Sequence, residues 1–533
     1  MDTSPLRRPL GSFFFALLLL SASLSSAAVD PAPANAKLPD PPADSIKAIN
    51  PTELRMHLEF LASKELGGRY TLSPSFAIAA RYLASRLESY GFHGAGANAS
   101  FLQPFEVISS KTDVEKSALT LQVKQEKAEY KYGDFTTFNS GSGSAEGPIV
   151  FIGYGISSPA QKHDDYANVD VKGKVVLVVG GTPADVDTSR LATNEQGEPA
   201  ARAHGAVGEL IISLRANAAN RKPGDPPPPV RESVRLDKPN DVRLPAVVLT
   251  PALADKLLAQ LDTNYEAFRA KRGAGFTSRP LDAFAKLNIT INETRTGTQN
   301  VVGILDGTDT KLKSEYVTLS AHYDHLKTNA AGEIYPGADD DGSGTSSVLA
   351  IARALSLKPP KRSVLVIFHA GEELGLLGSQ YNTDVAPVVP LENTVVDLNI
   401  DMIGRSRLEG DDNKADEQLT DANTIYPIGA DRISSELNNI EEQTNNDFEK
   451  LKLDYTLNDP KHPDRIYFRS DHWNYAKHGI PIIFYFDGTS VDYHRPTDTI
   501  EKIDFTKMTK VARLVFETGW RVANLDHRLA NSH

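Results

Sequence analysis

The chain has 533 residues, no cysteine and a formal net charge of −12 at pH 7. The lack of cysteine excludes disulfides and thiolate metal sites, so any metal must be held by His, Asp or Glu. The acidic balance argues against a nucleic-acid partner, and the length predicts two or three domains instead of one core.

The first residues have the pattern of an export signal. Arg7 and Arg8 form a basic start, residues 13–20 form an apolar run too short for a stable membrane anchor, and small residues follow. We expect a signal peptide over residues 1–28 and an exported protein, periplasmic or secreted, without a stable membrane span after cleavage. An uncleaved anchor is the alternative. Residues 29–45, rich in Pro, Ala and Asp, favour a linker.

The segment 46–115 begins with two amphipathic helical patterns. Apolar residues recur at helical spacing over 54–62 and again over 79–90, and a strand-like run follows at 101–108. We interpret this segment as the N-terminal part of a catalytic domain that residues 291–533 complete.

Between residues 116 and 290 the chain changes character. Turn-rich, strand-like runs predominate, such as 147–155, 173–179 and 244–249. No pattern of carboxylates and histidines stands out in this segment. It therefore indicates an inserted, non-catalytic, β-rich domain.

After residue 291 the pattern is typical of an α/β domain. Short runs rich in branched apolar residues, at 316–319, 364–368 and 395–400, alternate with helical patterns. Such runs predict a doubly wound, mostly parallel sheet that is buried on both faces. Ligands of such sheets gather at the carboxyl ends of the strands.

Metal-binding side chains follow these strands and the segments between them. The set is His322, Asp340, Glu373, Asp401 and, far downstream, His494. Two neighbouring divalent ions need a bridging carboxylate and about two further ligands each. These residues would give each ion one His and one carboxylate of its own, with a shared Asp between them. Imidazole and carboxylate ligands favour zinc.

Two further acidic residues have candidate roles beside these ligands. Glu372 directly precedes Glu373, so its side chain diverges from the ligand and suits a general base. Asp324 comes two residues after His322, on the same face of a strand, where it could accept the other N–H of the imidazole.

Each of these features alone has an ordinary structural explanation. The acidic run 339–341 also suggests a calcium loop, but the closing Glu of such a loop would fall on Ala350, and a His-Glu-x-x-His helix is absent from the sequence. The joint occurrence of the residues in this order is what favours a metal site.

Five segments carry a resemblance to a known family. They are 320–326, 337–344, 369–375, 399–404 and 492–496. They resemble the di-zinc aminopeptidases of metallopeptidase family twenty-eight, which also contains glutamate carboxypeptidase II and the transferrin receptor. The stretch 61–69 and the Gly-Lys-Val-Val region resemble exported bacterial members with a protease-associated insert.

The resemblance implies roles for the ligands. Asp340 would bridge two Zn²⁺ per subunit, His322 and Asp401 would hold one ion, and Glu373 and His494 the other.

It also implies Glu372 as the base and a tyrosine that steadies the oxyanion. Tyr493 is the nearest candidate for that tyrosine, with a buried core tyrosine as the alternative. His325 and His369 flank the motifs as packing or supporting groups.

The expected function is that of an exported zinc-dependent aminopeptidase. It would remove N-terminal residues from peptides through a metal-bridged hydroxide, with Glu372 as general base. One alternative is a di-zinc carboxypeptidase or amidohydrolase of the same fold, and another is a non-catalytic, receptor-like binding protein. The insert would either wall the substrate cleft or serve solubility, and the sequence leaves the oligomeric state open.

Overall fold

The computed structural model describes residues 38–181, 183, 186, 191–214, 228–238, 241–272, 275–459 and 462–532. The expected signal peptide, residues 1–28, and most of the expected linker lie outside the described residues. Helix α1 (Ala43–Ala48) begins within 29–45, so the end of that stretch is helical instead of a linker. Among the described helices, none is both long and apolar enough to cross a membrane.

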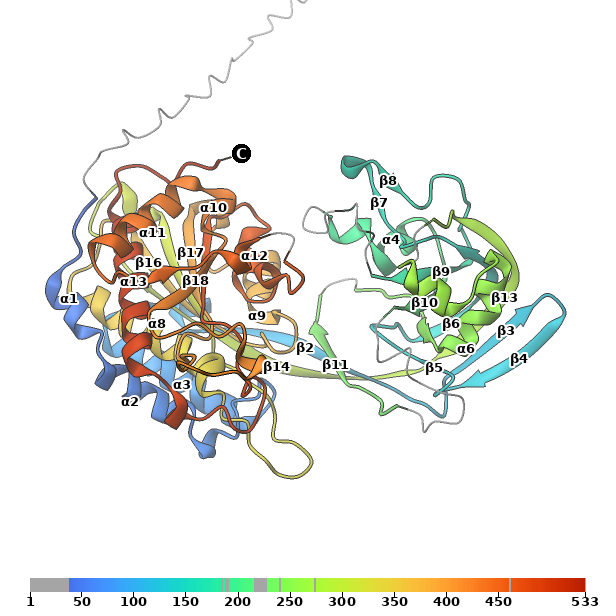
Figure 1. The fold of residues 1–533 in the computed structure, drawn as a ribbon, viewed down its shortest axis with the longest axis horizontal. Coiled ribbons are helices and arrows are strands. Elements are labelled where there is room, and N and C mark those ends of the chain that lie inside the picture. Colours follow the sequence, from blue (N-terminus) through green and yellow to red (C-terminus); the bar gives the residue numbers. More distant parts are fainter. Residues whose placement is uncertain are drawn as a thin grey trace, which may run out of the picture. The chain divides into compact units, whose positions relative to one another are not determined.

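The larger sheet has ten strands in the order β11-β2-β14-β16-β15-β17-β20-β18-β19, with β1 beside β14 (Figure 1). Its centre consists of parallel strands with almost wholly buried residues: β16 (Ser363–His369), β15 (Tyr316–His322), β17 (Thr394–Ile400) and β20 (Ile482–Phe486). The predicted α/β fold with a buried parallel sheet is confirmed. 

Antiparallel strands flank this centre. On one side lie β14 (Ile291–Leu305), β2 (Leu102–Thr112), β11 (Ser233–Leu236) and the short β1 (His93–Gly94). On the other side lies β18 (Thr424–Ile428), antiparallel to β20, and it is followed by β19 (Lys452–Leu453). The sheet is therefore mixed, with its parallel part in the middle.

Helices cover both faces of the central strands. Leu398 of β17 packs against Gly519 of α13 (Phe505–Asn524), whereas Asn399 donates to the hydroxyl of Ser470, just before α12 (His472–Ala476). Successive residues of a strand point to opposite faces, so α13 and α12 cover different sides.

The remaining helices surround these two. Helix α8 (Gly344–Leu357) packs beside α13, with α2 (Pro51–Leu61) and α11 (Ser435–Asp447) next to them, while α9 (Leu377–Gln380) contacts α12 and α3 (Pro74–Ser89) contacts β14.

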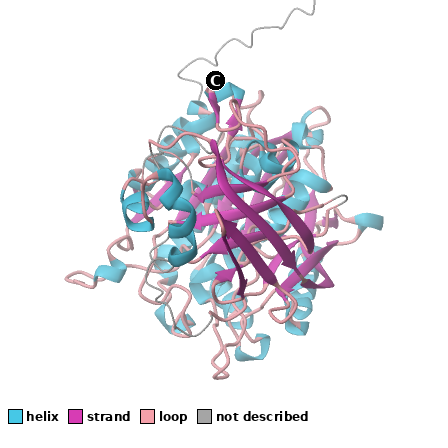
Figure 2. Cartoon of the chain, turned by 90° about the vertical axis from the view of Figure 1, so that its right-hand side faces the viewer, coloured by secondary structure: helices cyan, strands magenta, loops and turns pink. Residues whose placement is uncertain are grey.

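A second, eight-stranded sheet is built from residues 118–289. Its order is β4-β3-β13-β6-β9-β10-β12-β5. The bounds are β4 (Glu126–Lys131), β3 (Ala118–Val123), β13 (Arg279–Ile289), β6 (Gly143–Phe151), β9 (Val175–Gly180), β10 (Gly208–Ser213), β12 (Ala246–Leu249) and β5 (Phe135–Thr136). Helices α6 (Pro251–Leu258) and α7 (Tyr265–Ala270) pack on it, around Phe151 and Phe268. Figure 2 shows the strands as twisted arrows with helices at their margins.

The chain enters and leaves this second sheet at neighbouring positions. Strands β2 and β14 pair along their length, and the register places Thr112 opposite Ile291. The intervening residues thus start and end side by side.

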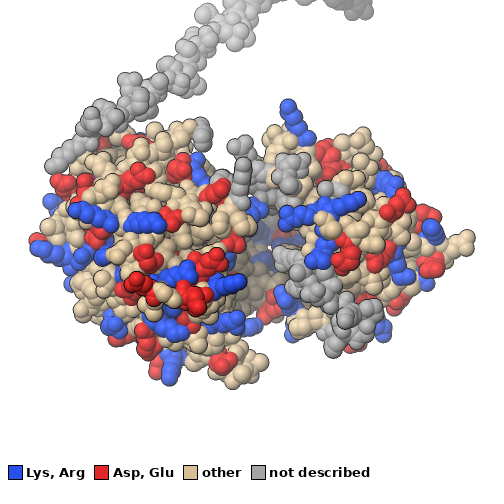
Figure 3. All heavy atoms as spheres, viewed as in Figure 1, with Lys and Arg blue, Asp and Glu red and all other residues tan. Residues whose placement is uncertain are grey.

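Charge is spread over the visible surface. On the face drawn in Figure 3, Lys and Arg are interspersed with Asp and Glu. The net charge of −12 is therefore not gathered into one acidic patch on that face.

Candidate metal centre

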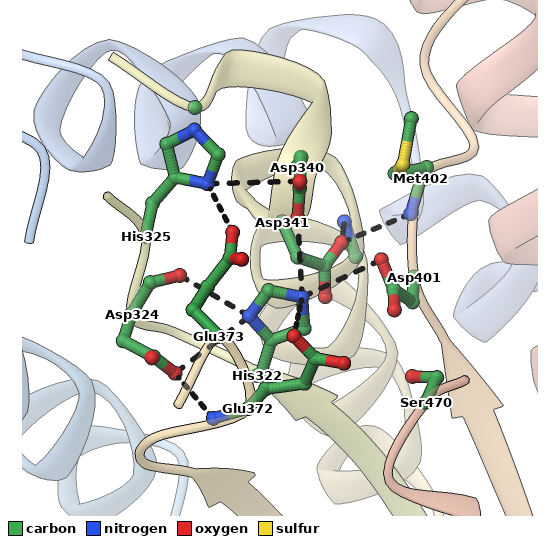
Figure 4. A network of polar contacts seen from close by, with 12 residues as sticks. His322, Asp324, His325, Asp340, Asp341, Glu372, Glu373, Asp401, Met402 and Ser470 are labelled. Atoms are coloured by element: carbon green, nitrogen blue, oxygen red, sulfur yellow. Dashed lines mark hydrogen bonds and ion pairs between the residues drawn. The ribbon is translucent and has the colours of Figure 1, made fainter. Parts of the chain in front are cut away.

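Four of the predicted ligands, His322, Asp340, Glu373 and Asp401, meet at the carboxyl edge of the parallel strands (Figure 4), and His494 reaches them from the loop after β20. His322 is the last residue of β15, and Asp401 directly follows β17. Glu372 and Glu373 lie in the turn after β16, and Asp340 lies in the turn before α8. Because these strands are parallel, their carboxyl ends bring residues far apart in sequence to one place.

The carboxylate of Asp340 lies between two histidines. Its Oδ1 is 3.2 Å from Nε2 of His322, and its Oδ2 is 3.1 Å from Nε2 of His494. Nε2 of His322 also lies 3.4 Å from Oδ1 of Asp401, and Nε2 of His494 lies 3.1 Å from Oε2 of Glu373. Each oxygen of Asp340 therefore faces a different histidine and a different second carboxylate.

His325 lies inside this cluster. Its Nδ1 is 2.7 Å from Oε1 of Glu373 and 3.6 Å from Oδ2 of Asp340. His369 points elsewhere, with its Nε2 3.3 Å from the hydroxyl of Tyr475. Of the two flanking histidines, the structure brings only His325 to the candidate ligands.

Asp324 contacts the centre in two ways. The nearest group to Nδ1 of His322 is the main-chain carbonyl of Asp324, at 3.1 Å, whereas the carboxylate Oδ1 is 3.7 Å away. That carboxylate instead accepts the backbone N–H of Glu372 at 3.2 Å and the hydroxyl of Thr71 at 2.7 Å. Asp324 thus links the His322 strand end to the turn that carries Glu372.

The centre concentrates buried negative charge. In the part of the chain that the structure describes, no Lys or Arg forms an ion pair with the carboxylates of Asp340, Glu372, Glu373 or Asp401. Burial raises the pKa of Glu372 well above its ordinary value, and Glu373 and Asp401 add to the rise.

The neighbouring histidines lower the pKa of a carboxyl group instead of raising it. Burial alone would raise the pKa of Asp340, but His325, His322 and His494 hold it well below its ordinary range. For His494, burial lowers the pKa, but contacts with Asp340 and Glu373 outweigh it and raise the value to about 10.

This donor set fits divalent cations. Nε2 of His322 and Oε1 of Glu373 are buried without a hydrogen bond to any described residue. Two groups of side chains could each hold an ion, because the ligand atoms within each group lie within 4.8 Å of one another. One group is His322, Asp340 and Asp401, and the other is His325, Asp340 and Glu373. Buried carboxylates that face only imidazoles need compensating positive charge, and metal ions supply it.

A pocket opens beside the cluster. Its wall includes apolar side chains, Met402, Ile466, Phe484 and Phe486, and its polar lining includes Asp340, Glu372, Asp401, Arg469, Thr489 and Tyr493. The ring of Tyr493 stacks on His494 with centroids 3.9 Å apart, and its hydroxyl accepts from Nη2 of Arg469 at 3.3 Å. Burial, with Asp340 and Glu373 nearby, raises the pKa of Tyr493.

Two residues that hold the centre in place are absent from the predicted set. The buried guanidinium of Arg69 donates to the carbonyls of Tyr323 and Gly337, at 3.0 and 2.9 Å, and so joins the loops after β15 and before α8. Asp498 accepts the backbone N–H of Asp339 at 3.1 Å and of Asp340 at 3.2 Å. The spacing of Asp498, four residues after His494, is the one signal that could have suggested it.

Comparisons with known proteins find relatives for part of the chain. Residues 300–519 match peptidase family M28. The chain is 37% identical over 125 residues to the aminopeptidase YwaD of Bacillus subtilis (strain 168), covering 24% of this chain and 25% of that protein. It is 32% identical over 231 residues to a probable leucine aminopeptidase of Arthroderma benhamiae, covering 40% and 55%.

A solved structure extends the likeness in fold. The aminopeptidase from Aneurinibacillus sp. strain AM-1 superposes with a TM-score of 0.52 at 19% identity, covering 91% of this chain and 96% of that one. The curated relatives are matched over part of their length, from 25% to 63% for those of highest similarity.

Proposed function

Residues 300–519 belong to peptidase family M28, and from this premise we propose that the chain is an exported, zinc-dependent aminopeptidase. The substrate class would be peptides with a free N-terminus. The similarity to an aminopeptidase and a probable leucine aminopeptidase supports this choice of reaction.

The observation that carries the proposal is the placement of Asp340. Its two oxygens lie 3.2 Å from His322 and 3.1 Å from His494, which is the arrangement a carboxylate shared by two ions requires. His322 and Asp401 would hold one Zn²⁺, and Glu373 and His494 the other. Bound zinc would polarise the scissile carbonyl and acidify water at the site.

The side chains around the ligands would handle protons and substrate. Glu372 lines the pocket without being needed as a ligand, and this place suits a base that takes a proton from water and passes it to the leaving amine. The hydroxyl of Tyr493, which accepts from Arg469, can donate its own proton to the developing oxyanion. The apolar wall would receive an uncharged side chain.

One observation favours the alternative, a carboxypeptidase or amidohydrolase. Arg469 lines the pocket, and among the described residues it has no carboxylate partner within ion-pair distance. A free guanidinium in this place could bind a substrate carboxylate. The two reactions differ in the terminus that must be free, so the substrate panel below separates them.

We also propose the domain division 46–115 and 291–533 for the peptidase domain and 116–290 for a protease-associated insert, from which β11 returns to pair with β2 in the larger sheet. The neighbouring ends of the insert, at the paired strands β2 and β14, support this division. Export through a signal peptide at residues 1–28 rests on the sequence pattern, and fractionation of cells that express the chain with and without these residues would test it.

The function is tested with the full chain, loaded with zinc, on matched substrates. We expect release of nitroaniline from an aminoacyl nitroanilide, loss of release when the amine is acetylated, and full activity on a peptide whose C-terminus is amidated. Cleavage of an N-acetylated peptide that keeps a free C-terminal carboxylate, without cleavage of the amidated peptide, would establish the alternative reaction. If the zinc-loaded protein hydrolyses none of these substrates, the remaining alternative is a non-catalytic binding protein.

A further inference from the structure

His325 contacts the candidate ligand Glu373 without belonging to the predicted ligand set. Its side chain is fully buried, and its Nδ1 lies 2.7 Å from Oε1 of Glu373. A nitrogen and a carboxylate oxygen at this distance match a charge-assisted hydrogen bond. The orientation of the His325 ring does not satisfy the angles of a hydrogen bond to Oε1. Neither Nδ1 of His325 nor Oε1 of Glu373 has another hydrogen-bond partner among the described residues. A buried donor and acceptor that both lack partners gain most by pairing with each other.

The two oxygens of Glu373 are divided between two histidines. Oε2 lies 3.1 Å from Nε2 of His494, which also lies 3.1 Å from Oδ2 of Asp340. The place for an ion is therefore bounded by Oε2, Oδ2 and the imidazole of His494. His325 faces Oε1, on the other side of the carboxylate, and its Nδ1 lies farther from Oδ2 of Asp340, at 3.6 Å.

The position of the His325 ring is fixed by the neighbouring loop. Gly337 has a φ of +57°, and a Cβ at this residue would lie 2.6 Å from Cγ of His325. The ring thus packs directly against the backbone of the turn that carries Asp340. It cannot swing away without moving that turn, because the backbone fills the space beside it.

We propose that His325 is a positioning residue for the Glu373-side ion: by pairing with Oε1 it holds Glu373 so that Oε2 alone binds the metal. This rests on the proposed two-ion centre. His325 then sets the affinity of one ion and leaves the other, held by His322 and Asp401, unchanged.

Two substitutions separate this role from direct ligation. Asn places an amide N–H where Nδ1 of His325 stands, but it is a poor zinc ligand, whereas Leu removes the donor. Measuring zinc affinity of the metal-free protein by competition with a chelator, we expect H325N to stay near wild type and H325L to weaken one ion about 10- to 100-fold. His57→Asn, a buried histidine 2.8 Å from the hydroxyl of Tyr82, controls for loss of a buried imidazole.

The affected ion is identified by removing one ligand at a time. In an H322A background the remaining ion is on the Glu373 side, so H325L should weaken it. In an H494A background H325L should change little. If H325L does not fold, His325→Gln replaces it, because its amide reaches the place of Nε2 instead of Nδ1.

Two results would overturn the proposal. Equal damage by H325N and H325L would make the imidazole itself a ligand, and an unchanged affinity in H325L would make it a packing residue. Peptidase activity is not the readout, so the two ideas fail separately. A chain that binds two ions but cleaves no aminoacyl substrate refutes the proposed function and leaves this inference standing.

Discussion

The two oxygens of Asp340 divide the centre into halves, one with His322 and Asp401, the other with His494 and Glu373. Glu372 belongs to neither half. Its Oε2 is 3.9 Å from Nε2 of His322, farther than the oxygens of Asp340 and Asp401, and it lines the pocket. Glu372, the proposed base, can therefore be replaced while every proposed ligand stays in place.

Replacing Glu372 by Gln should abolish catalysis while metal binding persists. The amide has nearly the same shape but cannot take a proton, so kcat should fall about 10²- to 10⁴-fold. Steady-state kinetics with zinc analysis of the same sample measures this. Glu392→Gln, at an exposed site, is the matched control. Retention of kcat within a few fold in E372Q would remove Glu372 from the role of base.

Tyr493 and Arg469 should act as one unit. Because the phenol oxygen accepts from Arg469, its own O–H is left free to donate to the oxyanion. We expect Y493F to lower kcat about 10²-fold, R469M to lower it less, and the double variant to match Y493F. An aminoacyl nitroanilide is the right substrate, because it carries no carboxylate for Arg469 to bind. Additive losses in the double variant would show that Arg469 acts independently of Tyr493.

Among the loops, the turn before α8 depends on a distant segment. Asp498, in the segment that also carries His494, accepts the backbone N–H of Asp339 and Asp340. One carboxylate thereby ties the candidate ligand Asp340 to the loop that carries the candidate ligand His494. Loss of the Asp498 carboxylate should therefore misalign the turn that carries Asp340 and the loop that carries His494.

We expect D498N to weaken zinc binding about 10- to 100-fold and to lower stability by about 1 to 3 kcal/mol, because the amide turns a donor toward backbone donors. Chelator competition and thermal unfolding measure the two effects. Asp504→Asn is the control, since Asp504 caps α13 by accepting from Thr506 and Lys507 and should affect stability alone. Equal zinc affinity in the two variants would contradict the positioning role of Asp498.

The strands differ in how far the sequence could predict them. The central strands were predictable because each is a buried apolar run, and two of them, β15 and β17, end at or directly before the candidate ligands His322 and Asp401. The exposed strand β4 was missed because solvent faces nearly all of it, and no alternation of apolar residues marks it.

The supporting contacts of the centre were not predictable either. Arg69 binds backbone carbonyls, and carbonyls carry no residue identity that a sequence pattern could reveal. His325 was read as packing or support, because its contact with Glu373 depends on how two turns meet. Contacts of this kind are set by tertiary structure instead of by local spacing.

At the scale of the whole molecule, stability depends on carboxyl groups buried far from the centre. Glu441 of α11 is fully buried, and that burial, helped by Glu442, raises its pKa to about 8. In the unfolded chain a Glu has a pKa near the ordinary 4.5. Between these values the folded protein keeps a proton that the unfolded chain releases, so rising pH favours unfolding.

Replacing Glu441 by Gln should remove this dependence. Well below pH 4.5 the variant and the wild type should differ little from this cause, since Glu441 holds its proton in the folded and the unfolded chain alike. As pH rises to about 8, the free energy of unfolding of the wild type should fall relative to E441Q, by at most about 1.4 kcal/mol per pH unit. Chemical unfolding of both proteins across this range measures the difference. For the exposed neighbour variant Glu442→Gln, the difference in the free energy of unfolding from the wild type should not grow comparably with pH. If the difference between E441Q and the wild type stays constant with pH, Glu441 ionises in the folded protein as it does in the unfolded chain.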